Sequence, residues 1–238
     1  MSVLILRLAG PVQSWGTYRV SYTSTPSAPM PTKSGVAGFL GALLGEKDYL
    51  GLLSRFALWV RVDRAQPVTI DLQVASSPKP RERQGFRRAR TLAYGKVANA
   101  PKQLTDTALP SLANREYLPF SEFICGLEGD DADVAQWYSQ ARRPTYMPYL
   151  GRQANAPTFP VLLGWSQQPA RSILAELPHV TSMHLTSSPP DGRLALYEVG
   201  GSYERTGPEV RERHEFVSPE ITTDRKGQLA WVQQHLNR

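Results

Sequence analysis

Disulfide bonds, membrane spans and a signal peptide are what this sequence lacks. Its single cysteine, Cys125, excludes an internal disulfide and any zinc site built from several cysteines. No apolar run approaches the ~20 residues that a helix needs to cross a bilayer. The opening segment, MSVLILRLAG, is too short and wrongly flanked for a signal peptide. We therefore expect a soluble, cytoplasmic protein.

Signatures of the common catalytic sites are also missing. PTKSG contains a Lys-Ser pair, but no glycine precedes it at the spacing of a phosphate-binding P-loop. Cys125 lies in an apolar, strand-like run, which favours a buried thiol over a nucleophile. The histidines lack the spacing of paired metal ligands: His179, His184, His214 and His235. We expect no metal, no cofactor and no catalytic residue. A general acid–base ribonuclease stays open, since lysines and tyrosines are frequent but no spacing selects a pair.

Positive charge is in excess and is concentrated in one segment. The chain has 27 Lys and Arg against 21 Asp and Glu, a net charge of +6. The segment from Ser76 to Arg115 has little apolar content and opens with SSPKPRERQGFRRAR. Its basic residues could neutralise several phosphates. They include Lys79, Arg81, Arg83, Arg87, Arg88 and Arg90. We predict an inserted arm at about residues 76–115, with a merely solvated surface as the alternative.

The pattern before this arm predicts strand, helix, strand, strand. Ser2 to Ala9 is an apolar strand, and Pro31 to Gly45 is a helix. Ala57 to Val62 and Val68 to Val74 alternate apolar and polar residues, as strands do. This order is the first half of a ferredoxin-like βαββαβ unit, an α+β fold.

The pattern after the arm predicts the second half of the unit. Phe120 to Leu127 indicates a strand, Ala132 to Arg142 a helix and Phe159 to Trp165 a final strand. Residues 166–238 are less regular, with one strand at Leu194 to Val199 and a terminal helix at Gln228 to Leu236. We divide the chain into residues 1–165, which include the arm, and a smaller C-terminal portion, 166–238.

The helix at Pro31 to Gly45 is unusually rich in glycine. Interior glycine costs roughly 1 kcal/mol relative to alanine, so the glycines should serve a purpose. One side of the helix carries Val36, Leu40 and Leu43 and should face the sheet. The opposite side carries Gly38, Gly41 and Gly45, and we expect a close neighbour there, either a partner or the chain's own loop from Thr17 to Met30.

Polar and aromatic residues around this helix suit an RNA-binding surface. Lys33 and Ser34 stand at the helix start, where a phosphate would be favoured. Tyr94, Tyr146, Tyr149 and Trp15 offer ring faces on which unpaired bases could stack. Ordinary packing of these rings under loops is the alternative.

Five blocks of the sequence resemble one known family. They are LILRLAGPVQSWG (Leu4 to Gly16), PTKSGVAGFLGALLG (Pro31 to Gly45), REYL (Arg115 to Leu118), and RPTYMPYLGR with FPVLLG (Arg143 to Gly164). In this order and combination they closely resemble the CasD family. This is the subunit of the type I-E CRISPR Cascade complex that belongs to the fifth Cas family, in the RAMP superfamily.

The resemblance implies a fold, a role and partners. The fold would be a ferredoxin-like (RRM-like) RAMP domain with an inserted basic thumb and a smaller C-terminal β-containing portion. The role would be to hold the 5′ handle of the guide RNA (crRNA) in this antiviral ribonucleoprotein complex. The thumb would reach the backbone subunit of the seventh Cas family. The protein would also contact the large subunit, and target DNA only through the complex, with no membrane contact.

The resemblance also bears on catalysis. A type I-E subunit of this kind is not expected to be an enzyme, because a separate subunit cuts the precursor RNA. In type I-C relatives the fifth-family protein is itself the metal-independent endoribonuclease, which makes that activity the alternative. No histidine precedes His179 to form a Lys-His pair.

Residue pattern and family blocks together predict the RNA contacts. They lie on the GPVQSWG turn, the start of the glycine-rich helix, the arm and the YMPYLGR loop. The predicted residues are Gln13, Ser14, Trp15, Lys33, Ser34, Arg81, Arg83, Arg87, Arg88, Arg90, Arg143, Tyr146, Tyr149 and Arg152.

Overall fold

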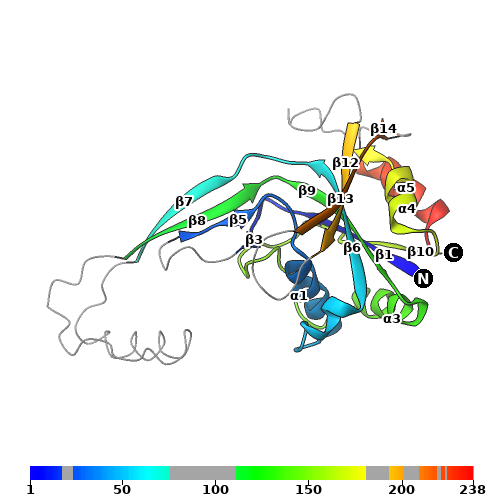
Figure 1. Ribbon diagram of the computed structural model, residues 1–238, viewed down its shortest axis with the longest axis horizontal. Coiled ribbons are helices and arrows are strands. Elements are labelled where there is room, and N and C mark those ends of the chain that lie inside the picture. The colour runs from blue at the N-terminus through cyan, green and yellow to red at the C-terminus, as the bar shows by residue number, and fades with distance from the viewer. Residues whose placement is uncertain are drawn as a thin grey trace, which may run out of the picture.

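A six-stranded antiparallel sheet forms the centre of the molecule (Figure 1). The computed structural model describes residues 1–17, 24–75, 111–180, 193–200, 209–218, 221–222 and 224–237. The strand order is β10-β1-β9-β6-β12-β13, and every neighbouring pair is antiparallel. The strands are β1 (Ser2–Ala9), β6 (Phe56–Arg64), β9 (Glu122–Gly129), β10 (Leu162–Ser166), β12 (Arg193–Gly200) and β13 (Glu209–Val217). The predicted α+β class is confirmed in this coarse form.

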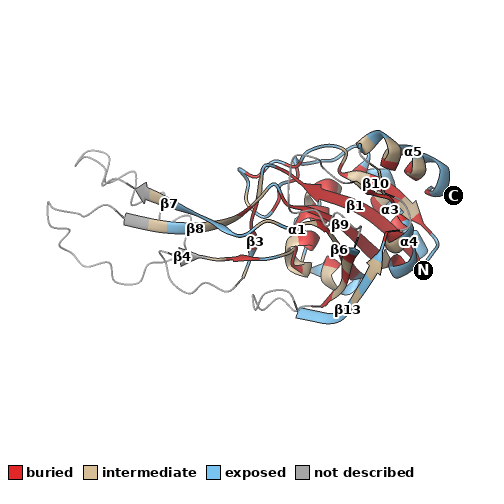
Figure 2. Ribbon diagram, turned by 90° about the horizontal axis from the view of Figure 1, so that it is seen from above, coloured by how far each residue is buried: buried red, intermediate tan, exposed pale blue. Residues whose placement is uncertain are grey.

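Helices α1 (Lys33–Leu44) and α3 (Asp131–Ala141) cover one face of the sheet. The Thr32 hydroxyl caps α1 by accepting the Gly35 amide at 3.2 Å, and Gly45 ends it with a left-handed φ of 76°. Val36, Leu40 and Leu43 are buried in the same cluster as Leu4 of β1. Figure 2 shows this buried layer between α1 and the strands.

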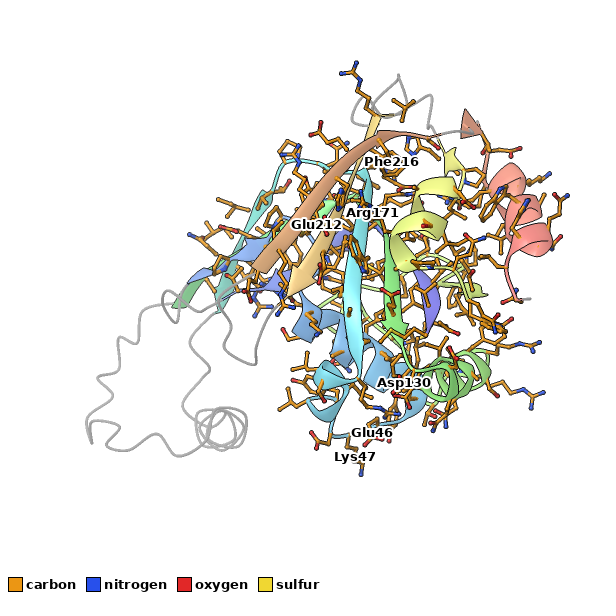
Figure 3. All side chains as sticks on the ribbon, turned by 45° about the vertical axis from the view of Figure 1, so that its right-hand side comes forward. Glu46, Lys47, Asp130, Arg171, Glu212 and Phe216 are labelled. Atoms are coloured by element: carbon orange, nitrogen blue, oxygen red, sulfur yellow. The ribbon has the colours of Figure 1, made fainter. Side chains whose placement is uncertain are left out.

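The glycine side of α1 packs against the chain's own next turn. A Cβ on Gly41 would lie 2.8 Å from the Tyr49 Cβ and 3.1 Å from the Glu46 carbonyl oxygen. This turn, which carries Glu46 and Lys47 at the end of α1 (Figure 3), leads into a 3-10 helix at Gly51–Ser54. The close neighbours of these glycines are therefore residues 46–49 for Gly38 and Gly41, and Thr145 for Gly45, instead of the described part of the loop 17–30.

Helices α4 (Ala170–Glu176) and α5 (Arg225–His235) cover the other face. Val3, Ile5 and Ile124 of the sheet are buried with Ile173 and Val232 of these helices. A short parallel pair, β11 (His179–Val180) with β14 (Ile221–Thr222), joins this layer. The sheet is thus covered on both sides, and C-terminal residues fill the face opposite α1 and α3.

The C-terminal residues also extend the sheet itself. β12 pairs with β6, and β13 pairs with β12. Arg171 of α4 lies beside Glu212 of β13 (Figure 3), with 3.9 Å between the charged atoms. The strand predicted at 194–199 and the helix predicted at 228–236 are found as β12 and α5. The division of the chain at residue 165 stays a prediction.

A hairpin projects from the body of the molecule (Figures 1 and 2). It consists of β7 (Thr69–Ala75) and β8 (Ser111–Pro119), which pair antiparallel. Four short strands lie at its base: β2 (Val12–Gln13) and β4 (Ser24–Thr25) pair with β8, and β3 (Trp15–Gly16) pairs with β5 (Ser27–Ala28). Residues 76–110 of the predicted arm lie outside the described residues.

One strand assignment is wrong. The sequence predicts residues 68–74 as the third strand of the central unit, but β9 occupies that place and β7 belongs to the hairpin. The apolar positions of β7 do not face a core: Ile70 and Leu72 are 63% and 59% exposed. Alternation in a sequence indicates a strand with two different faces, and it does not say that one face is buried.

Candidate nucleic-acid interface

The GPVQSWG turn and the YMPYLGR loop meet at the end of β1. The Ser14 amide donates to the Leu150 carbonyl at 3.1 Å. A Cβ on Gly151 would lie 1.6 Å from the Ser14 carbonyl oxygen, and the φ of Gly151 is 83°. Only glycine permits this approach, so the two segments, far apart in sequence, are fixed against each other.

A shallow groove opens where this contact meets the hairpin. Its volume is about 610 Å³, and its lining residues are Arg115, Tyr117, Tyr149, Gly151, Arg152, Gln153 and Ala154. Arg115 and Tyr117 come from β8, and the others come from the loop after α3. The sequence predicted Tyr149 and Arg152 as site residues, and the structure brings these two together.

The groove combines two guanidinium groups with two aromatic rings. The Arg152 guanidinium carbon lies 4.8 Å from the centroid of the Tyr117 ring, which is the geometry of a cation–π contact. Tyr149 is 44% exposed. Guanidinium groups bind phosphate, and tyrosine faces stack on unpaired bases. The groove therefore has the chemistry to hold a nucleotide of a single strand.

The loop leading to the groove presents more exposed side chains. Its start is attached to the end of α1, because the amides of Thr145 and Tyr146 donate to the carbonyls of Leu43 and Ala42, each at 3.1 Å. Tyr146 is 51% exposed, and Arg143 is also exposed. Both remain accessible to a partner, as an RNA-contact role requires.

Gln13, Ser14 and Trp15 are buried instead of exposed. The Gln13 side-chain nitrogen donates to the carbonyls of Leu8, at 3.1 Å, and Ser121, at 2.6 Å. The Trp15 indole donates to the Gln13 side-chain oxygen at 3.1 Å. Buried amide and indole groups need such partners. Trp15 belongs to the apolar core that also holds α1, so the polar, aromatic turn that suggested an exposed contact is part of the protein interior.

Lys33 and Ser34 lie at a different place, at the start of α1. The Lys33 ammonium is 5.3 Å from the centroid of the Phe56 ring. Burial lowers the pKa of Lys33, Arg211 on β13 lowers it further, and Glu198 opposes the shift. Ser34 is half-buried. The contacts of Lys33 are with β6, β12 and β13 rather than with the groove.

The basic arm residues have no described position. Arg81, Arg83, Arg87, Arg88 and Arg90 lie outside the described residues, so their RNA contacts stay a prediction. Arg115 and Tyr117 are the groove residues that the sequence did not select. Their signal was the spacing Arg-x-Tyr within a strand, which places both side chains on one face.

The described ranges contain neither a group of potential metal ligands nor an exposed cysteine. There, no three His, Cys, Asp or Glu side chains are grouped as metal ligands. Cys125 is fully buried, as predicted, and burial raises the pKa of its thiol far above the usual value. None of the helices in the described part of the chain is long and apolar enough to span a membrane.

Fold and groove together define an α+β protein with a projecting hairpin and a basic, aromatic groove at the hairpin base. The sequence model of the family described as "CRISPR-associated protein (Cas_Cas5)" matches residues 3–222. The chain belongs to this family, which confirms the resemblance read from its sequence blocks.

Individual relatives agree with this assignment. The "CRISPR system Cascade subunit CasD" of Escherichia coli (strain K12) is 31% identical over 180 residues, covering 73% of this chain and 76% of that protein. A chain of a "CRISPR RNA-guided surveillance complex" shares the fold with a TM-score of 0.68 at 22% identity, covering 98% of this chain and 100% of that one. A "Crystal structure of Cas protein" matches with a TM-score of 0.58 at 26% identity, covering 92% and 95%.

Proposed function

We propose that this protein is a non-catalytic, crRNA-binding subunit of a type I-E Cascade complex in the cytoplasm, and that it holds the 5′ handle of the guide RNA. The observation that carries the proposal is the groove, in which Arg115 and Arg152 stand beside Tyr117 and Tyr149. The similarity to CasD of Escherichia coli, a Cascade subunit, supports the proposal that this protein assembles into a Cascade complex.

The strand order supports the ferredoxin-like description of the domain. In chain order, the unit runs β1, α1, β6, β9, α3, β10. In the sheet, its four strands are ordered β10-β1-β9-β6. This is a βαββαβ unit with the fourth strand beside the first and the third between the first and second. The RAMP assignment rests on this order and on the sequence blocks.

In this proposal RNA lies in the groove with its bases unpaired. Tyr149 stacks on a base, and Arg152, held over the Tyr117 ring, binds a phosphate. Residues 76–110 of the arm carry further arginines, which in this proposal add phosphate contacts. Phosphate contacts supply affinity that falls with salt, and base contacts supply the choice of handle.

The hairpin also offers a surface for neighbouring subunits. Val68, Ile70 and Leu72 are exposed at alternate positions, and the last two belong to β7. An apolar row on a projecting strand suits a protein partner better than RNA. We assign it to the backbone subunit of the seventh Cas family. Contact with the large subunit, and through it with target DNA, is part of the same assembly.

The test uses the assembled complex and the purified chain. Complex purified with the double variant Tyr149→Ala/Arg152→Ala should retain less guide RNA than the wild-type complex. Arg171→Ala is the matched control, because Arg171 is an exposed arginine on α4, away from the groove. Equal RNA retention by the groove variant and by Arg171→Ala would refute RNA binding at the groove.

Cleavage is tested separately. The purified chain is incubated with a labelled repeat RNA hairpin in EDTA, and the RNA is expected to stay intact. A discrete cleavage product would contradict the non-catalytic role and establish the endoribonuclease alternative. No described histidine lines the groove, so general acid–base chemistry there would have to use Tyr117 or Tyr149.

A further inference from the structure

One buried carboxylate near the end of β1 holds three arginines. The Glu122 side chain accepts from Arg7 Nε at 2.9 Å and from Arg225 Nη2. Arg64 Nη2 lies 3.7 Å from the other carboxylate oxygen. Arg7 and Glu122 are buried, whereas the side chains of Arg64 and Arg225 are 16% and 23% exposed. The cluster therefore reaches the surface through two of its guanidinium groups.

A second buried pair adjoins this cluster. Arg61 Nε donates to Asp63 at 2.6 Å, and both side chains are buried. Among the residues that the structure describes, the ion pairs of Arg7, Arg61, Arg64 and Arg225 are with two carboxylates, Glu122 and Asp63. His179 beside Asp63 adds no negative charge, and the exposed neighbours Asp224 and Lys226 offset each other. Two positive charges remain without a counter-charge among these groups.

Two exposed phenylalanines flank the same cluster. Phe120 is 54% exposed and Phe159 is 68% exposed. Arg64 Nε donates to the Phe120 carbonyl. Arg7 Nη1 donates to the carbonyls of Thr158, at 3.1 Å, and Pro160, at 3.4 Å, on either side of Phe159. The arginines therefore hold the backbone from which both rings project.

The backbone of Phe120 is in a strained conformation, and its ring is exposed. Its φ is 46°, in the left-handed region that a bulky L-residue seldom adopts. The amide donates to the Pro11 carbonyl at 3.0 Å, and the carbonyl is held by Arg64. Phe120 stands in the short turn between β8 and β9, and strained residues concentrate at binding sites.

We propose that Phe120, Phe159, Arg64 and Arg225 form a second contact surface for single-stranded RNA, at the end of β1. The rings stack on bases, and the two surface guanidinium groups bind phosphates. The inference rests on the proposed function, since it extends the path of the same RNA. Tyr117 in the groove is three residues before Phe120, at most about 11 Å of extended chain, so one strand reaches both places within a few nucleotides.

Charge selects RNA over a protein partner at this surface. An exposed ring pair alone suits either. The excess of positive charge among the described groups calls for an anion, and a phosphodiester chain provides both bases for the rings and phosphates for the guanidinium groups. An acidic protein segment is the competing occupant, and the test separates it.

The test is photo-crosslinking within the assembled complex containing labelled guide RNA. Phe120 and Phe159 are replaced, one at a time, by the photoreactive residue p-benzoylphenylalanine, which suits exposed aromatic positions. Tyr149 is replaced in the same way as the groove site, and Val217, 60% exposed on β13, is the control. We expect crosslinks to RNA from positions 120, 159 and 149, and none from 217.

Each outcome decides between the two sites. RNA crosslinked from Tyr149 but not from positions 120 and 159 overturns this inference and leaves the proposed function intact. A crosslink from positions 120 and 159 to a protein chain also overturns it, in favour of the acidic segment. Absence of RNA crosslinks from all three positions would refute both.

A salt titration checks the arginines independently. Arg64→Gln should lower the slope of log affinity against log salt concentration by about 0.7 if one phosphate contact of a single strand is lost. A merely structural role for Arg64 would change stability without changing this slope. An unchanged slope would remove Arg64 from the RNA-binding surface.

Discussion

The two faces of the central sheet are held in different ways. Toward α1 and α3, β1 contributes Leu4, Leu6 and Leu8, all buried in an apolar cluster. Toward α4 and α5, the same strand contributes Val3 and Ile5 and then Arg7, which enters a charged network. One face is stabilised by apolar burial, which tolerates repacking. The other depends at one end on charges that must all keep their partners.

The charged network explains how the C-terminal layer is attached. Arg61 donates to the carbonyls of Leu174, at 2.6 Å, and Leu177, at 2.5 Å. Gln228 of α5 donates to the Pro178 carbonyl at 2.8 Å. Arg61 of β6 and Gln228 of α5 thus bind the same short segment, residues 174–178. Phe120 and Phe159 lie at the charged end of this face. Arg225 of α5 therefore both attaches the C-terminal layer through Glu122 and belongs to the proposed second RNA surface.

The largest expected effect is on the charged face. Arg61→Ala removes the partner of Asp63 and leaves a buried carboxylate with one neighbour, His179. Removing one member of a buried ion pair costs about 3–5 kcal/mol. Urea unfolding should show a loss of this size, while Arg171→Ala on the surface should change the free energy of unfolding by less than about 0.5 kcal/mol. If Arg61→Ala lowered the free energy of unfolding by less than about 1 kcal/mol, the charged face would not depend on its ion pairs as proposed.

A smaller effect is expected on the apolar side. Gly41→Leu forces a side chain into the space of Tyr49, whose Cβ would lie 2.8 Å from the new Cβ. Overpacking of this kind costs about 1–3 kcal/mol. Thermal unfolding measures it, and Gly51→Leu is the control, because there the nearest atom, in Asp48, lies 3.8 Å away. Equal stability of both variants would mean that the turn at 46–49 does not pack on α1.

Acid should weaken the charged face selectively. Burial alone would raise the pKa of Asp63, but Arg61 and His179 beside it lower the pKa to about 2. A carboxyl with a lowered pKa stabilises the fold above the unfolded value and loses that contribution as pH falls toward 2. Relative to pH 6, the free energy of unfolding at pH 2 should fall less in Asp63→Asn than in wild type, by up to about 2 kcal/mol.

The control for this acid effect is Asp133→Asn. Asp133 is the carboxyl that Arg55 binds, outside the network, and its pKa is lowered mainly by that hydrogen bond. Removing it should leave most of the acid sensitivity in place. If Asp63→Asn and wild type fell equally between pH 6 and pH 2, the network would not account for acid sensitivity.

The hairpin should show the smallest effect on stability. Ile70→Ser and Leu72→Ser change side chains that are already exposed, so the free energy of unfolding should change by less than about 0.5 kcal/mol. Assembly with the backbone subunit should nevertheless weaken, as measured by co-purification. Val217→Ser, at an exposed position of β13, is the matched control. Normal assembly of the hairpin variants would remove this surface from the interface.

The sequence predicted the local elements better than their surroundings. The helix expected at 31–45 is α1, Lys33–Leu44, because its cap, stripe and terminal glycine are all local signals. β7 was assigned to the wrong sheet, since its alternating pattern resembles that of a half-buried strand. Gln13 and Trp15 were taken for exposed contacts, because only the tertiary partners Leu8 and Ser121 reveal that they are buried.

Only one side of the groove could be predicted from the sequence. Tyr149 and Arg152 lie in a compact loop whose composition stands out in the sequence. Arg115 and Tyr117 approach them from β8, more than thirty residues earlier in the chain. No local pattern reports that approach. The close contact of Gly151 with Ser14 fixes the loop beside the turn that pairs with β8, and this is long-range information.

A salt titration of guide RNA retention tests the central claim most directly. Complexes with wild-type protein, Arg152→Ala and Arg171→Ala are compared over increasing salt. The account predicts that Arg152→Ala releases RNA at lower salt, with a slope reduced by about 0.7 for the lost phosphate contact, whereas Arg171→Ala follows wild type. Coincident curves for all three proteins would contradict RNA binding at the groove.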